Sequence, residues 1–234
     1  AGVTITPKTP LHFVPEEYGL SSTHLKRIDS IALDGIRQGA YPGCQVVVLK
    51  NGHIMFDKSF GTYAGKGSPR VESTSIYDLA SLSKTTGTLL AIMKLYDKGR
   101  FNLTDKISDH LPFLQRTDKK DITIQEILYH QSGLPSWILF YQEAIDKDSY
   151  DGRLFSARKD AHHPLQLGTT SWANPKFKFK SEYVSPVKTG DYTVQICDSL
   201  WLNRSFRKVM EEKIMEAPLK QKRYVYSDVG FILL

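Results

Sequence analysis

The sequence is poor in cysteine and has no long apolar run. Its 234 residues include two cysteines, Cys44 and Cys197, each beside apolar residues, so we expect small buried side chains and neither a disulfide framework nor a metal site. No stretch approaches the roughly 18 apolar residues of a membrane span. A Gly-x-Ser-x-Gly motif is also absent, which disfavours the catalytic triad of the α/β-hydrolases. With 41% apolar residues, however, the chain can bury a core.

Acidic residues are outnumbered in this chain. The 31 lysines and arginines exceed the 25 aspartates and glutamates by six, and many of the positive charges fall between Lys176 and Arg223. A basic surface of this kind suits an anionic polymer such as cell-wall material or nucleic acid. A solvated basic face explains the same charges more simply. Because no nucleic-acid recognition motif is present, we expect no nucleic-acid partner.

A helix followed by an antiparallel hairpin is predicted for the first part of the chain. Residues 21–23 form a capping cluster, and apolar residues recur at helical spacing from Leu25 until Gly39 closes the helix. A strand is expected over 44–49, and Asn51-Gly52 predicts a tight turn into a second strand over 54–60. The run of valines favours a strand that is covered on both faces.

Helices and loops are predicted after the glycine-rich loop at 61–69. Residues 77–81 lead into an apolar helix that ends at Gly99, and a shorter helix at 122–129 stops at the turn 130–135. From 140 to 188 no period is clear, which indicates an irregular surface segment. A helix is expected again between Leu200 and Met215.

The pattern Ser-x-x-Lys occurs four times, starting at Ser81, Ser156, Ser185 and Ser205. Only Ser81 sits where an extended segment enters an apolar helix, so that Ser81 and Lys84 share one helical face. A serine hydroxyl becomes a nucleophile when a base removes its proton, and lysine can be that base if burial and nearby cations lower its pKa. For an arbitrary copy, a capping serine with a surface lysine is the simpler interpretation.

Three segments in order, 77–85, 95–105 and 128–135, resemble the class C β-lactamase and D-alanyl-D-alanine carboxypeptidase family of penicillin-binding proteins. The first reads Tyr-Asp-Leu-Ala-Ser-Leu-Ser-Lys-Thr, the second ends in Asn-Leu-Thr-Asp, and the third is Leu-Tyr-His-Gln-Ser-Gly-Leu-Pro. The hairpin at 42–61 and residues 224–234 resemble the family as well. The resemblance implies an α/β (α+β) fold of the β-lactamase/transpeptidase type, with an antiparallel sheet flanked by helices, a mostly helical lobe, and no cofactor or metal.

By this resemblance, Tyr226-Ser227-Asp228 takes the place of the family's Tyr-x-Asn motif. Tyr226 would then lie near Ser81 and Lys84, relay a proton to the leaving group, and afterwards help water to attack the acyl-enzyme. Asp228 would bind substrate, but an ionised carboxylate only accepts hydrogen bonds and adds negative charge beside Lys84, whereas the usual Asn both donates and accepts. A half-buried structural tyrosine is the alternative interpretation of Tyr226.

The family's third motif, a Lys-Thr-Gly or His-Thr-Gly strand, should follow the tyrosine motif. Lys188-Thr189-Gly190 precedes it, so we interpret this match as accidental. Because the chain ends at Leu234, the resemblance implies a single incomplete domain over 1–234, truncated before the C-terminal sheet strands. Its parts would be a helix and hairpin at 20–75 and a helical lobe at 76–234 with an irregular insertion at about 140–195. An uncovered edge of the hairpin would then favour self-association.

Two classes of function follow from the resemblance. The first is a serine hydrolase that forms an acyl-enzyme with a peptidoglycan peptide, a β-lactam, an ester or a related amide. The second is a non-catalytic cell-wall-binding or scaffolding domain, or an inactive fragment. Both imply a location in the periplasm or elsewhere outside the cytoplasm, with membrane association as an option. Residues 15–20 resemble the joint by which such domains follow a glycoside hydrolase domain, and His130, His162 and His163 are interpreted as structural or solvated.

Overall fold

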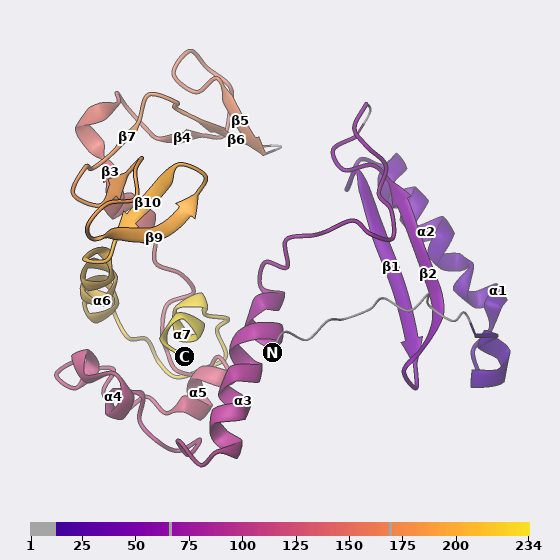
Figure 1. Cartoon of the computed structure of the whole chain (residues 1–234), viewed down its shortest axis with the longest axis horizontal. Coiled ribbons are helices and arrows are strands. Elements are labelled where there is room, and N and C mark those ends of the chain that lie inside the picture. The colour runs from indigo at the N-terminus through magenta and orange to yellow at the C-terminus, as the bar shows by residue number, and fades with distance from the viewer. Residues whose placement is uncertain (1–12, 66, 169) are drawn as a thin grey trace. The chain divides into compact units, whose positions relative to one another are not determined.

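The computed structural model describes residues 13–65, 67–168 and 170–234, and the chain divides into two compact units. Unit 1 ends at Leu79 and unit 2 begins at Ala80. Within the described residues, no helix has the length and apolar content of a membrane span. The elements of unit 1, shown in indigo to magenta in Figure 1, are η1 (Pro15–Tyr18), α1 (Ser22–Leu25), α2 (Arg27–Arg37), β1 (Gly43–Lys50) and β2 (His53–Gly61).

The helical start of unit 1 confirms the predicted helix, with a break at Lys26 between α1 and α2. The Ser21 hydroxyl accepts a hydrogen bond from the backbone N–H of His24 at 3.3 Å and so caps α1. Gly39, at φ +72°, lies just beyond α2 in the left-handed conformation that commonly ends a helix. Between these two ends, the apolar side chains at helical spacing, Leu25, Ile28, Ala32 and Ile36, all belong to the packed cluster of unit 1.

The hairpin is also confirmed, because β1 and β2 pair antiparallel around Asn51 and Gly52. Both turn residues have positive φ, 52° and 78°, as a type I′ turn requires. Within unit 1, α2 packs on one face of the hairpin, whereas Val47 and Leu49 are 46% and 60% exposed on β1. We expected both faces of the hairpin to be covered, but within unit 1 only the face that packs against α2 is covered. The packed cluster contains Leu25, Ile28, Ala32, Ile36, Cys44, Val46, Val48, Phe56 and Phe60.

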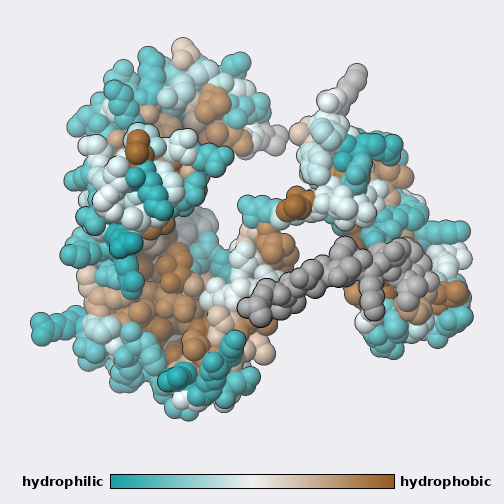
Figure 2. Space-filling model, in the orientation of Figure 1, coloured by the Kyte–Doolittle hydropathy of each residue, from teal (hydrophilic) through white to brown (hydrophobic). Residues whose placement is uncertain are grey.

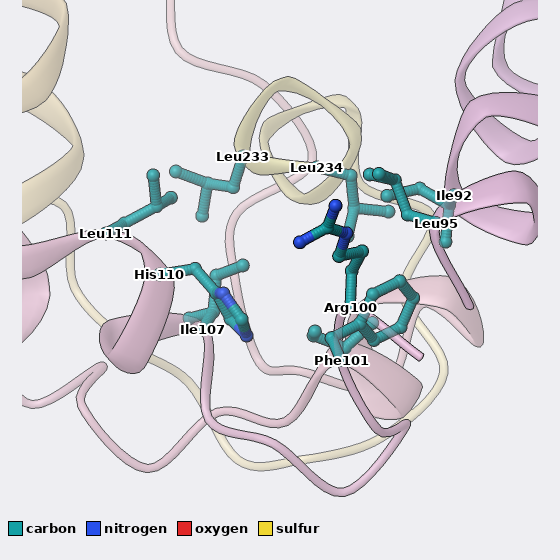
Figure 3. A pocket seen from close by; sticks show the side chains of 10 residues that line it. Ile92, Leu95, Arg100, Phe101, Ile107, His110, Leu111, Leu233 and Leu234 are labelled. Atoms are coloured by element: carbon teal, nitrogen blue, oxygen red, sulfur yellow. The ribbon is translucent and has the colours of Figure 1, made fainter. Parts of the chain in front are cut away.

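The helices of unit 2 enclose an apolar core. Leu114 and Val229 are 0% exposed and Ile127 is 1% exposed, and all three belong to one cluster. Apolar surface gathers over the part of unit 2 that holds α5 and α7 (Figure 2), and an apolar pocket opens between α3, α4 and α7 (Figure 3). The helical elements are η2 (Lys84–Thr88), α3 (Leu89–Asp97), α4 (Ile107–His110), η3 (Pro112–Leu114), α5 (Ile124–Leu128), η4 (Phe140–Ala144), η5 (Lys147–Ser149), α6 (Phe206–Glu216) and α7 (Asp228–Leu233).

Residues 145–203 contain short strands, which corrects the prediction of an irregular segment. The strands form three small antiparallel sheets with the orders β3-β7, β4-β6-β5 and β8-β10-β9. They are β3 (Ile145–Asp146), β4 (Phe155–Ser156), β5 (Leu165–Gly168), β6 (Ser171–Ala173), β7 (Lys178–Phe179), β8 (Val184–Ser185), β9 (Tyr192–Cys197) and β10 (Leu200–Asn203).

Two local predictions in this region are wrong. The helix expected from Leu200 begins at Phe206, because residues 200–203 pair as β10 with β9 and β8. Cys197, expected to be buried, is exposed at the end of β9. Cys44, in contrast, is half-buried among the apolar residues of unit 1. Together, the two units contain helices and small antiparallel sheets, as the expected mixed fold requires.

Candidate active site

Ser81 and Lys84 meet at the start of the longest apolar helical region of unit 2. The Lys84 Nζ donates a hydrogen bond to the Ser81 Oγ at 3.2 Å. Ala80, directly before the serine, has φ +43°, a conformation that non-glycine residues seldom adopt and that recurs at functional sites. Lys84 begins the π-helical turn η2, in which the Leu89 N–H donates to the Lys84 carbonyl. Such turns are also frequent at functional sites.

The other three Ser-x-x-Lys copies place their side chains differently. The Ser156 Oγ accepts from the backbone N–H of Arg158 at 3.1 Å, and the Ser185 Oγ donates to the carbonyl of Val187 at 2.8 Å. Ser205 precedes α6. Within the described residues, Ser81 is therefore the one serine of the four whose hydroxyl is hydrogen-bonded to its lysine.

Tyr226 and Asp228 reach the same lysine from a segment that lies far away in the sequence. The Lys84 Nζ is 2.7 Å from Asp228 Oδ1 and 5.3 Å from the centre of the Tyr226 ring. Asp228 opens α7, which the Ser227 hydroxyl caps by accepting the Gly230 N–H at 3.2 Å. The structure thus brings all four sequence-predicted site residues together around one ammonium group.

The turn at 130–136 holds this distant segment in place. The Val225 N–H donates to the His130 carbonyl at 2.9 Å, and the Asp228 N–H donates to the Ser136 carbonyl at 2.8 Å. Between them, the Ser227 hydroxyl donates to the Pro135 carbonyl at 2.7 Å. The Tyr226 side chain therefore projects from a backbone that is tied down on both sides.

The surroundings of Lys84 stabilise its charge. The contact with the Asp228 carboxylate raises the pKa of Lys84, burial opposes this rise, and Tyr226 adds to it. The condition under which Lys84 would be a ready base, a pKa lowered by burial and nearby cations, is therefore not met in the free protein, because the contact with the Asp228 carboxylate outweighs burial. Lys84 is an ammonium at neutral pH, and it donates to Ser81 rather than accepting its proton.

Asp228 depends on Lys84 in return. Its side chain is 46% exposed, but its Oδ1 atom is buried and, among the described residues, has no hydrogen bond of good geometry. The nearby ammonium of Lys84 is what compensates this buried oxygen. A neutral Lys84 would leave the buried Oδ1 of Asp228 without a positive partner. The contact therefore favours the ion pair with a charged Lys84.

His130 belongs to the site, although its sequence context indicated only a structural turn. Its ring lies 4.5 Å from the Tyr226 ring, and its Nδ1 accepts the Ser227 N–H at 3.1 Å. Burial lowers the pKa of His130, the charge of Lys84 lowers it further, and Asp228 raises it. The signal available in the sequence was the position of this histidine inside one of the three segments that carry the resemblance.

Other candidate ligand groups lie elsewhere. Lys188-Thr189-Gly190 stands in the turn before β9, where Thr189 bridges to Tyr192. Within residues 13–65, 67–168 and 170–234, no group of three or more His, Cys, Asp or Glu side chains could hold a metal ion. The pocket in Figure 3 is lined by ten residues, none of which is one of the four site residues.

Comparisons with known proteins agree with the resemblance stated above. The family model described as Beta-lactamase matches residues 28–234. The chain is 31% identical over 187 residues to Protein flp of Staphylococcus aureus (strain MRSA252), covering 78% of this chain and 37% of that protein. It is 30% identical over 159 residues to a protein of Salmonella heidelberg (strain SL476) that carries the provisional name D-alanyl-D-alanine carboxypeptidase, covering 62% of this chain and 35% of that protein.

Among solved structures, the octameric penicillin-binding protein homologue from Pyrococcus abyssi matches with a TM-score of 0.54 and 19% identity. The match covers 89% of this chain and 37% of that one, and it confirms the expected β-lactamase/transpeptidase-like fold. The chain spans a little over one third of the length of these relatives.

Proposed function

Because the chain belongs to the Beta-lactamase family, whose members are generally hydrolases, we propose that it acts as a serine hydrolase with Ser81 as nucleophile. The observation that carries the proposal is the 3.2 Å hydrogen bond between Lys84 Nζ and Ser81 Oγ, with Tyr226 and Asp228 around the same ammonium. The reaction is acyl transfer from a peptidoglycan peptide, a β-lactam, an ester or a related amide. A peptidoglycan peptide as substrate would place the reaction outside the cytoplasm.

In the proposed reaction, Ser81 Oγ bonds to the acyl carbon while its O–H bond breaks. In a concerted relay, the Lys84 ammonium releases one proton through Tyr226 to the leaving group, whose bond to the acyl carbon breaks, and Lys84 takes up the serine proton in its place. Lys84 is thus charged before and after the transfer, which suits its raised pKa. Water then attacks the acyl carbon with Tyr226 assisting, the bond from that carbon to Ser81 Oγ breaks, and Ser81 Oγ takes up a proton from the attacking water.

A non-catalytic binding or scaffolding domain is the second candidate function. The ion pair between Lys84 and Asp228 favours it, because it keeps Lys84 protonated, and an ammonium has no lone pair with which to take up the serine proton. In that case Ser81 would be no more reactive than an ordinary exposed serine.

A fluorophosphonate probe separates the two functions. With the 234-residue chain, we expect one adduct on Ser81, detected by intact mass and peptide mapping, and its complete loss in Ser81→Ala. The matched control is Ser185→Ala, which removes the serine of another Ser-x-x-Lys copy and should leave labelling unchanged. A folded chain that gains no adduct on Ser81 would contradict the hydrolase proposal and support the binding domain.

A further inference from the structure

One histidine holds the backbone on both sides of Tyr226. The His130 carbonyl accepts the N–H of Val225 at 2.9 Å, and the His130 Nδ1 accepts the N–H of Ser227 at 3.1 Å. The imidazole ring also lies against the Tyr226 ring, with centroids 4.5 Å apart and planes at 38°. Phe231 of α7 packs on the imidazole at 5.2 Å. The main chain and the side chain of one residue thus fix the position from which the Tyr226 phenol projects.

The backbone of His130 is itself unusual. α5 ends at Leu128, the His130 N–H bonds to the Ile127 carbonyl at 3.0 Å, and His130 takes φ +55°. Among non-glycine residues, Asn, Asp and His adopt this left-handed conformation most readily. The conformation turns the chain at the end of α5, and both the carbonyl and Nδ1 of His130 accept from the segment at 225–227.

The side-chain contact requires a neutral ring. An unprotonated Nδ1 accepts a hydrogen bond, whereas both ring nitrogens of the imidazolium donate. The groups around the ring are the Lys84 ammonium, the Asp228 carboxylate, and the phenols of Tyr224 and Tyr226. Burial and Lys84 lower the pKa of His130 against the opposing effect of Asp228, so the ring is neutral at neutral pH.

We propose that His130 is the positioning residue for Tyr226, that it acts through the Nδ1 acceptor, and that protonation of the ring releases the tyrosine segment. The proposal deepens the proposed function and rests on it, since Tyr226 matters to Ser81 only if the site transfers acyl groups. Below the pKa of His130, the Nδ1–H faces the Ser227 N–H, and two donors repel. Reaction of Ser81 then declines on the acid side because Tyr226 has moved, even though no reacting atom has changed its charge.

His130→Asn and His130→Phe test the acceptor directly. Asn tolerates the left-handed backbone, and its Oδ1 accepts a hydrogen bond without titrating, so His130→Asn should label Ser81 near the wild-type rate and lose the acid-side decline. Phe keeps a ring against Tyr226 but offers no acceptor. We expect His130→Phe to label about tenfold to a hundredfold more slowly than the wild type at neutral pH, the loss of one buried hydrogen bond, and this difference should narrow at acid pH, where the wild-type ring is protonated.

A second measurement, made on the wild-type chain, does not depend on activity or on the folding of a variant. The amide resonance of Ser227 should shift with pH along the titration of His130. If wild-type Ser81 takes no probe while the Ser227 resonance follows His130, the proposed function fails and the positioning contact stands. Any of three results overturns the positioning role. They are labelling of His130→Phe at the wild-type rate at neutral pH, an acid-side decline that persists in His130→Asn, and a Ser227 amide resonance that does not shift as His130 titrates.

Discussion

Asp228 places a carboxylate beside Lys84, where the resemblance to the family implies an Asn, and this carboxylate sets the charge balance of the site. The folded-state pKa of Lys84 lies above its unfolded value, so the stabilisation from this lysine is present at neutral pH and up to about 10.4. It is lost as pH rises through the raised folded pKa. The pair is therefore intact over the whole neutral range, and any base role of Lys84 has to begin from the charged form.

Asp228→Asn should lower the pKa of Lys84, because removing the carboxylate removes the main group that favours the ammonium. The basic limb of the pH dependence of Ser81 labelling should then move to lower pH. Asp198→Asn, an equal charge change in the turn between β9 and β10, is the matched control and should leave the profile unchanged. An unshifted profile in Asp228→Asn would mean that Lys84 is not the group that titrates.

At this scale, the sequence named the residues that meet in the structure, but not the distances between them. Ser81, Lys84, Tyr226 and Asp228 could be named because each stands in a recognisable segment. The direction of the pKa shift of Lys84 could not, since it depends on a 2.7 Å contact between residues 144 positions apart. The contribution of His130 likewise requires the distances to Val225 and Ser227, which no local pattern encodes.

Among the secondary elements, the turn at 130–136 does most to assemble the site. Gly133 has φ +80°, and a side chain there would collide with the backbone carbonyl of Lys220. The Lys220 N–H in turn donates to the Gly133 carbonyl at 2.9 Å. Glycine is required here both by its backbone conformation and by the close approach of another chain segment.

Gly133→Ala should therefore lower the free energy of unfolding by about 1–3 kcal/mol more than Gly152→Ala does. Gly152 has a similar φ, +76°, but a side chain there would meet nothing within 4 Å, so this control carries the cost of the conformation without the collision. Denaturant unfolding of both variants measures the difference. Equal losses would show that the approach of Lys220 is not constraining.

Elements formed by neighbouring residues were predictable, and elements that need distant partners were not. The α2 helix and the β1–β2 hairpin follow from apolar spacing and from the Asn51-Gly52 turn, all within about forty residues. The apolar residues of β10 also fit the start of the helix that was expected from Leu200. They form a strand because they pair with β8 and β9. Strands of two to four residues carry too short a pattern to be read from sequence.

The behaviour of the whole molecule in solution depends on one face of the hairpin in unit 1, whose exposed apolar side chains favour association with another copy of the chain. Val47 and Leu49 are exposed there, and β1 and β2 form a sheet of two strands among the described residues. A two-stranded sheet offers unpaired edges to another chain.

We expect the chain to self-associate through this face and edge, with an average mass in light scattering that rises with concentration. Replacing Val47 and Leu49 together by lysine should reduce that rise, because charge opposes edge-to-edge pairing. The control places the same two lysines at Thr23 and Gln38, exposed polar positions of unit 1, and should associate like the wild type. A chain that is monomeric at all concentrations would contradict the prediction.

The π-helical turn η2 also affects how this chain must be aligned with its relatives. Its hydrogen bond joins Leu89 to Lys84, five residues apart, so the turn holds one residue more than an α-helical turn would. A relative with a regular helix here would be one residue shorter between the lysine that matches Lys84 and the residue that matches Ile92 in the core. An ungapped alignment across 84–89 would therefore match either the site or the core correctly, but not both.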